Sequence, residues 1–281
     1  MATLTWTGGE SATTKSFTNS ANWGGSTPSN DDTLIINSTS DAIAGAATGL
    51  TGITFRVGSG FTGTIGSSTT YLDLDGPLCE FASGGTAAYL TGTWTNFRIT
   101  GGSASSSFLV LKGNASTAIT TLLASRLSGT VTVGSSAAVT TVQMNGSNVG
   151  TIDLASSITG LANITVTEGT IACASTISGT ASVIGGTLQT SGTSVYPTIE
   201  IDTDGSCDYR SSGTITTLNI FDGVFTSRDN ETAGFTITTA NNYSGGRLLL
   251  DSALNNATVT NPISMLGGDA SFAVGSTISL G

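Results

Sequence analysis

The sequence predicts an all-β protein whose single chain forms a parallel β-helix, or β-solenoid, with coils of about 20 residues and an N-terminal cap. Three observations lead to this fold class. Patterns that favour helices are nearly absent, short alternating runs are bounded by Gly, Ser, Asn or Asp, and a glycine-led unit recurs along the second half of the chain. Because crossovers between parallel strands are right-handed, we expect a right-handed solenoid.

The recurring unit is a glycine, any residue and then an apolar residue, and it returns about every 20 residues. A strand–turn–strand unit of this length cannot bury its own apolar face, but stacked units bury it against one another. We therefore expect the solenoid to cover residues 50–281, with less regular coils over residues 50–128. The units begin at Gly129, Gly150, Gly169, Gly186, Gly205, Gly223, Gly246 and, more loosely, Gly268.

The residue two positions after each glycine is predicted to point inward, because side chains alternate across a strand. An antiparallel sandwich has a similar strand spacing, but it does not require a fixed glycine corner followed by one apolar column. Each of these positions holds an apolar residue or a cysteine, which favours the solenoid. The predicted core column consists of Val131, Ile152, Ile171, Leu188, Cys207, Phe225 and Leu248, followed by Ala270.

Charge and composition exclude several functional classes. The 281 residues contain 8 Lys and Arg, 18 Asp and Glu and no His, which gives a formal net charge of −10. A chain this acidic lacks the cations that nucleic-acid binding needs, and the absence of His excludes Ser-His and Cys-His nucleophiles and His-ligated metals. No apolar run is long enough to span a membrane. Cys79, Cys173 and Cys207 are expected to be buried free thiols of a protein made in a reducing cytoplasm.

Residues 1–49 differ from the repeats and are predicted to be a cap and anchoring segment. An exposed solenoid end presents an apolar core and unpaired strand edges, so it needs a cover. Trp6 and Trp23 are the expected lids over the first coil, and Asp32 is a further candidate for the cap or anchor. The competing interpretation makes the two tryptophans platforms on which a ligand stacks.

The order of Trp6, Asn22-Trp23, Pro28 and Asp31-Asp32 before the first apolar strand resembles the start of bacteriophage β-solenoid virion proteins, which include capsid decoration (cement) proteins and tail-spike-like proteins. It is also similar to the start of autotransporter passenger domains, but those carry a signal peptide, and the N-terminus here lacks that pattern. The phage resemblance implies a virion protein that is made in the host cytoplasm and lies on the capsid surface. It implies the major capsid protein as partner and a homotrimer as assembly. Because the sequence begins at Met1, we expect a complete gene product.

Acidic residues recur beside the corner glycines, where Asp-Gly is an ordinary turn dipeptide. Asp202, Asp204 and Asp208 resemble part of a calcium loop, but the third early ligand and the distal Glu of such a loop are missing. The pairs Asp73–Asp75 and Asp202–Asp204 have a spacing that a glycosidase could use, although few aromatic residues are present to line a sugar groove. We therefore expect no catalytic residue, no metal ligand and no cofactor.

The expected function is structural. The resemblance favours a non-enzymatic capsid decoration protein that binds and stabilises the phage head shell, and the acidic balance favours basic patches on the coat protein. The alternative is a receptor-binding tail spike or fibre adhesin that recognises host surface glycans.

Overall fold

The fold is all-β, with parallel strands stacked in a β-solenoid of about 10 turns and about 21 residues per turn. This confirms the fold class that the sequence predicts. The structure is a computed structural model that describes residues 1–82, 87–102, 108–113, 116–147, 149–227, 234–251, 257–272 and 276–278. Residues 1–139 and 147–152 form a first unit, and residues 140–146 and 153–281 form a second unit.

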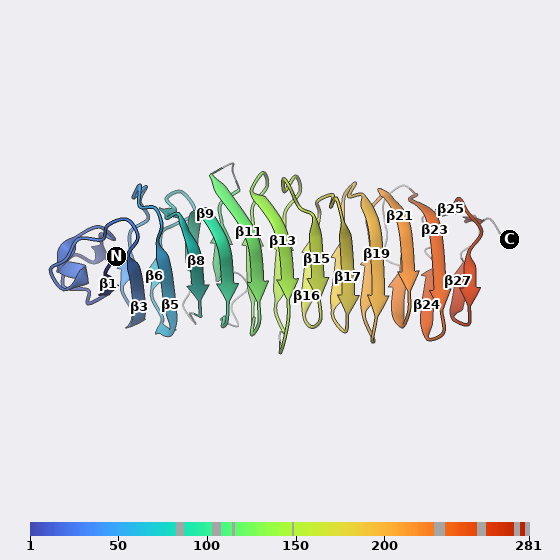
Figure 1. Cartoon of the computed structure of the whole chain (residues 1–281), viewed down its shortest axis with the longest axis horizontal. Coiled ribbons are helices and arrows are strands. Elements are labelled where there is room, and N and C mark those ends of the chain that lie inside the picture. The colour runs from blue at the N-terminus through green and yellow to red at the C-terminus, as the bar shows by residue number, and fades with distance from the viewer. Residues whose placement is uncertain are drawn as a thin grey trace. The chain divides into compact units, whose positions relative to one another are not determined.

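In each unit the strands belong to two parallel sheets, here named sheet A and sheet B, and consecutive turns lie side by side (Figure 1). In the first unit β3 pairs with β5 in sheet A while β4 pairs with β6 in sheet B. In the second unit β19 pairs with β21 in sheet A while β18 pairs with β20 in sheet B. The long strand β9 serves both sheets, because its first half pairs with β10 in sheet B and its second half pairs with β11 in sheet A.

The elements up to the division between the units are the 3₁₀ helix η1 (Ser20–Trp23), β1 (Thr3–Thr5), β2 (Thr14–Lys15), β3 (Thr33–Thr39), β4 (Ala42–Ile43), β5 (Thr54–Phe61), β6 (Thr64–Ile65), β7 (Leu72–Asp73), β8 (Gly76–Phe81), β9 (Ala87–Ile99), β10 (Leu109–Leu111), β11 (Thr117–Ala124) and β12 (Thr130–Val133). Both β13 (Ala138–Met144) and β14 (Thr151–Leu154) contain the division. The remaining elements are β15 (Asn163–Val166), β16 (Thr170–Cys173), β17 (Thr180–Ile184), β18 (Thr187–Thr190), β19 (Tyr196–Asp202), β20 (Ser206–Tyr209), β21 (Thr214–Ile220), β22 (Gly223–Thr226), β23 (Thr236–Tyr243), β24 (Gly246–Leu250), β25 (Thr258–Val259), β26 (Ser264–Leu266), β27 (Asp269–Phe272) and β28 (Thr277–Ile278).

The core of the second unit contains a column of inward side chains that strand register aligns from turn to turn. On sheet B, Ile171 is opposite Leu188, Leu188 is opposite Cys207, and the column continues through Phe225 to Leu248. All five side chains are fully buried. Two further residues of the predicted column, Val131 and Ile152, are fully buried in the first unit, and Ala270 on β27 is opposite Leu248 and half-buried.

The corner glycines allow one turn to approach the next closely. At Gly223 the backbone has a φ of 104°, which L side chains rarely adopt. A Cβ atom at this position would also collide with the carbonyl oxygen of Gly205 in the preceding turn. The glycine is therefore required both by the conformation of the corner and by the close stacking of the turns.

The start of the first unit combines strand pairing with an aromatic cover. Parallel pairing begins with β1, which is in register with β3, so both strands lie within the segment for which the sequence predicts a cap. Between them, the Asn19 side chain accepts a hydrogen bond from the Ala21 N–H, and Gly24 in the left-handed region ends η1. This short helix places Trp23 over the core, where its ring meets Phe17 edge-on at 5.2 Å.

Candidate functional site

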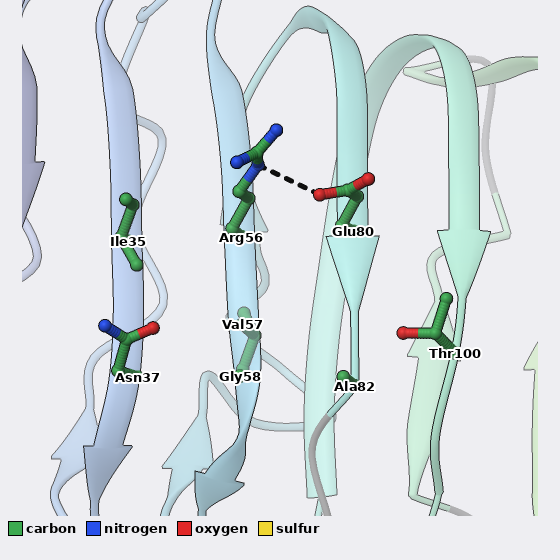
Figure 2. Close-up of a pocket in the computed structure, with 8 residues that line it drawn as sticks. All are labelled: Ile35, Asn37, Arg56, Val57, Gly58, Glu80, Ala82 and Thr100. Carbon is green, nitrogen blue, oxygen red and sulfur yellow. Dashed lines mark ion pairs between the residues drawn. The ribbon is translucent and has the colours of Figure 1, made fainter.

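The candidate functional site is a groove of about 360 Å³ on the outer face of sheet A in the first unit (Figure 2). It crosses β3, β5 and β8 and includes the residues that directly follow β8 and β9. Its lining residues are Ile35, Asn37, Arg56, Val57, Gly58, Glu80, Ala82 and Thr100.

Strand alternation and parallel register together build this groove. In β5 the residues Phe55 and Val57 are buried, so Arg56 between them points outward. Register then places Arg56 opposite Ile35 on one side and Glu80 on the other. These outward residues form one wall of the groove, because parallel pairing aligns equivalent positions of successive turns in a row.

The floor of the groove is low because small residues occupy the next outward row. Gly58 follows the buried Val57, and the Ala82 N–H donates to the Val57 carbonyl oxygen, so Gly58 and Ala82 lie side by side. A Cβ atom at Gly58 would lie 3.0 Å from the Asn37 carbonyl oxygen and would begin to fill the hollow. Figure 2 shows the Asn37 and Thr100 side chains at opposite ends of this floor. The groove therefore has an apolar bottom and a polar rim.

The wall carries alternating charges. Arg56 Nε lies 2.9 Å from Glu80 Oε2, and Arg98 Nη1 lies 3.7 Å from Glu80 Oε1. The three side chains are 49%, 31% and 48% exposed, so solvent screens both ion pairs and each adds at most about 1 kcal/mol to stability. A guanidinium has five N–H donors, and these contacts use only part of that capacity. The row therefore presents a net positive charge and spare donors to an acceptor-rich partner.

Two charged side chains line the groove, Arg56 and Glu80. Glu80 is the one carboxylate among the eight lining residues, and the two arginines already neutralise it. Hydrolysis by a carboxylate pair requires a second carboxyl group across the substrate, and the lining residues do not supply it. Among the described residues, no group of three or more His, Cys, Asp or Glu could hold a metal ion.

A second polar cluster lies on the outer face of sheet B in the first unit. Tyr71 and Tyr89 meet edge-on with ring centroids 5.6 Å apart, and Lys112 Nζ lies 5.4 Å from the centroid of Tyr71. Burial raises the pKa of Asp73 in the same cluster, the nearby Asp75 carboxylate raises this pKa further, and Lys112 opposes both effects. The Thr93 N–H donates to Asp75 Oδ1 at 2.5 Å. The structure thus places two aromatic rings beside an aspartate pair for which the sequence predicts few aromatic neighbours.

Three aspartates lie around the turn between β19 and β20 in the second unit, and their carboxylates are placed differently. Asp202 Oδ1 accepts a hydrogen bond from the Thr203 N–H at 2.9 Å, and Asp204 is exposed in the left-handed region of backbone conformation. Asp208 instead pairs with the Arg210 guanidinium and accepts a hydrogen bond from Gln189. The described geometry therefore presents Asp202 and Asp204 as turn residues and commits Asp208 to a salt bridge.

The predicted cap residues lie together in the first unit. Trp6 and Trp23 are 7% and 3% exposed, and their rings meet edge-on at 5.0 Å. Trp23 Nε1 donates to the Phe17 carbonyl oxygen, and Trp6 Nε1 donates to Asp41 Oδ2 at 2.9 Å. Because both rings are buried and both N–H groups are bonded, neither offers an open face on which a ligand could stack.

Asp32 is buried at the same end of the first unit and acts as an acceptor for backbone donors. Its Oδ1 accepts from the Ala2 N–H at 2.6 Å, and its Oδ2 accepts from the Ser29 N–H and Oγ at 3.0 and 2.9 Å. Burial alone would raise the pKa of Asp32, but these hydrogen bonds outweigh burial and lower it. Asp32 therefore fastens the first strand to the loop that precedes β3.

The three cysteines are free and buried, as the sequence predicts. Burial raises the pKa of all three thiols, most strongly at Cys79 and Cys207. A buried thiol with a raised pKa is unreactive at neutral pH. These residues pack as small apolar side chains.

Sequence reasoning missed the groove. Buried and outward residues alternate along β5, β8 and β9, and the outward positions include Arg56, Glu80 and Arg98. Because the coils of the first unit differ in length, the intervals of sequence between these three residues are unequal. The sequence contains one hint of the groove. Cations are scarce in this chain, yet two of its 8 Lys and Arg flank one glutamate in the structure.

Comparisons of the chain with protein-family models, with curated proteins and with solved structures found no match. Among the described helices, none has the length and apolar character needed to cross a membrane.

Proposed function

We propose that the chain is a non-enzymatic structural protein of a bacteriophage particle, a capsid decoration (cement) protein that binds the major capsid protein and stabilises the head shell. The observation that carries the binding role is the groove on sheet A, with its charged wall and its floor of Gly58 and Ala82. Paired parallel strands hold these side chains in fixed rows, so a partner meets a preformed surface. The phage identity rests on the resemblance of the N-terminal segment and on the solenoid fold.

The groove favours recognition over turnover. Its single carboxylate, Glu80, pairs with Arg56 and Arg98, so it is poorly placed to act as an acid, a base or a nucleophile. A partner that brings carboxylate or carbonyl oxygens to Arg56, with a small apolar group over Ala82, would complement both the wall and the floor. A symmetric homotrimer on the capsid surface is part of the same proposal.

The test is co-sedimentation of the purified full chain with head shells that lack decoration protein. We expect saturable binding and a higher temperature of shell disruption. Arg56→Ala removes the one cation that lines the groove and should weaken binding about tenfold, which corresponds to about 1.4 kcal/mol. The matched control is Arg126→Ala, which removes an exposed cation from outside the groove and should leave the affinity unchanged.

A second candidate function is that of an adhesin of a tail spike or fibre that recognises host surface glycans. The observation that favours it is the Tyr71–Tyr89 pair with Lys112 and Asp73, since aromatic rings beside charged groups suit the apolar faces and hydroxyls of sugars. Absence of binding to shells, together with binding to host cells or their polysaccharide that Tyr89→Ala removes, would replace the first proposal with this one.

A further inference from the structure

A row of exposed apolar side chains crosses sheet A of the second unit at the downstream ends of its strands. This row, here named the aromatic stripe, consists of Ile184, Phe221, Tyr243 and Leu266. Register aligns its members: Ile184 is opposite Asp202, the Phe221 N–H donates to the Ile201 carbonyl oxygen, and Tyr243 is opposite Leu266. The stripe is thus a product of turn stacking, since its members come from four different turns.

The stripe exposes large apolar groups to solvent. Ile184 and Phe221 are each 38% exposed, and Leu266 is 57% exposed, while Tyr243 is half-buried. The rings of Phe221 and Tyr243 stack with centroids 4.8 Å apart and planes 22° apart. Exposed apolar side chains that gather in one row of a sheet are typical of docking surfaces.

Acidic residues border the stripe. Asp202 lies within the row between Ile184 and Phe221, Glu200 is two residues upstream on β19, and the exposed Asp222 directly follows Phe221. The strands that carry the stripe and its border, β17, β19, β21, β23 and β26, contain no Lys or Arg. The nearest cation along the chain, Arg247, belongs to β24 of the other sheet. Among the described residues, the strands that carry the stripe and its border therefore contribute only negative charge.

These features distinguish between possible occupants. The stacking of Phe221 and Tyr243 covers one face of each ring, which reduces the aromatic surface on which a sugar could stack. A second copy of this stripe would bring its own acidic border and be repelled, in a chain whose formal net charge is −10. A partner with alternating apolar and cationic side chains would cover the rings and neutralise the border in one contact.

We propose that the aromatic stripe and its acidic border form a docking surface for a basic amphipathic segment of a partner protein, one that alternates apolar residues with Lys or Arg. The surface is separate from the groove of the first unit, and the inference does not depend on which particle or cell carries the protein. The apolar residues of the segment pack on Phe221 and Leu266, and its cations meet Asp202, Glu200 and Asp222.

The test uses the full chain and a fluorescein-labelled model peptide in which Leu and Lys alternate, with binding measured by fluorescence anisotropy. A control peptide of the same length carries Glu in place of Lys. We expect saturable binding of the Leu–Lys peptide that weakens as salt rises, and at least about tenfold weaker binding of the Leu–Glu peptide. Equal binding of the two peptides would overturn the inference.

Two variants separate the stripe from the rest of the surface. Phe221→Ser should weaken binding of the Leu–Lys peptide about tenfold, and Asp202→Asn combined with Asp222→Asn should weaken it and flatten its salt dependence. The matched control Thr239→Ala changes a half-buried residue on the same face of sheet A but outside the stripe, so the affinity should stay the same.

A loss of peptide binding can be distinguished from a loss of folding and from a failure of the proposed function. The denaturation midpoint of Phe221→Ser should stay close to that of the parent, because the side chain is partly exposed and loses mainly its stacking contact with Tyr243. An unchanged affinity for the Leu–Lys peptide in a folded Phe221→Ser variant would refute the stripe. Because this assay contains no head shell, failure of shell binding does not alter its result, and failure of peptide binding leaves the shell experiment intact.

Discussion

Inward apolar side chains are buried at the covered start of the first unit, but one of them is partly exposed in the β26–β27 turn of the second unit. At the start, Phe55 on β5 meets Phe17 at 5.9 Å, and the buried Trp6 and Trp23 rings pack over Phe17. In the other turn, Phe272 is opposite the buried Leu250, yet its side chain is 41% exposed. An inward position is therefore buried only where another layer packs on it, and the alternation of a strand does not guarantee that layer.

The largest expected effect that tests this comparison is the loss of the aromatic cover. Trp23→Ala should lower the free energy of unfolding by about 3–5 kcal/mol, because it empties a buried site between two aromatic rings. Phe272→Ala, the matched change in the exposed turn, should cost less than about 1 kcal/mol. Urea denaturation of both variants measures the difference, and equal losses would show that the cover does not protect the core.

A pair of leucines in the second unit contrasts a covered inward position with an outward position of the stripe. Leu248→Ala removes a fully buried member of the core column and should cost about 2–5 kcal/mol. Leu266→Ala, at a side chain that is 57% exposed, should change stability by less than about 0.5 kcal/mol. The measurement is the shift of the denaturation midpoint, and a loss at Leu266 as large as that at Leu248 would mean that the β26 turn is as tightly packed as the column.

The smallest of the three effects concerns the polar fastening of the cover. Asp32→Asn should cost about 2 kcal/mol at neutral pH, because the amide keeps one accepting oxygen and cannot accept from both Ala2 and Ser29 as the buried carboxylate does. Folding lowers the pKa of Asp32 below its ordinary value of 3.8. The ionised carboxylate therefore stabilises the protein at any pH above 3.8, and this stabilisation is lost as the pH falls through the pKa of the folded state.

Denaturation as a function of pH therefore checks the prediction for Asp32. The stability gap between the parent and Asp32→Asn should be widest at neutral pH and should shrink below the ordinary carboxyl pKa of 3.8. The control Asp204→Asn alters an exposed carboxylate in a turn and should show almost no gap at any pH. A gap for Asp32→Asn that stays constant through acid would exclude the ionised carboxylate as its source.

The column from Ile171 to Leu248 could be predicted because a glycine stands two positions before each inward residue and so marks its place in every turn. The cover could be predicted in outline, since two tryptophans precede the first apolar strand. Phe17 was not singled out, although it links the tryptophans to Phe55 in the core, because a lone aromatic residue in a polar loop has no periodic signal.

The candidate surfaces were beyond the reach of sequence patterns. Arg56 and Glu80 become neighbours through the register of β5 with β8, and Phe221 and Tyr243 become neighbours through the stacking of β21 and β23. In both cases other strands separate the partners along the chain, β6 and β7 in the first case and β22 in the second. The alternation indicates that each side chain faces outward but does not indicate which outward residues share a row.

The order of residues alone therefore established the β-solenoid, its approximate coil length, its glycine corners and its inward column. The physical reason is that side chains alternate with a period of two along a strand and that a short apolar unit can be buried only by its copies. The tertiary structure decided which outward residues form the groove and the aromatic stripe, and which inward residues are covered. Lateral register and the presence of a next layer set these properties, and both depend on contacts between turns that are distant in sequence.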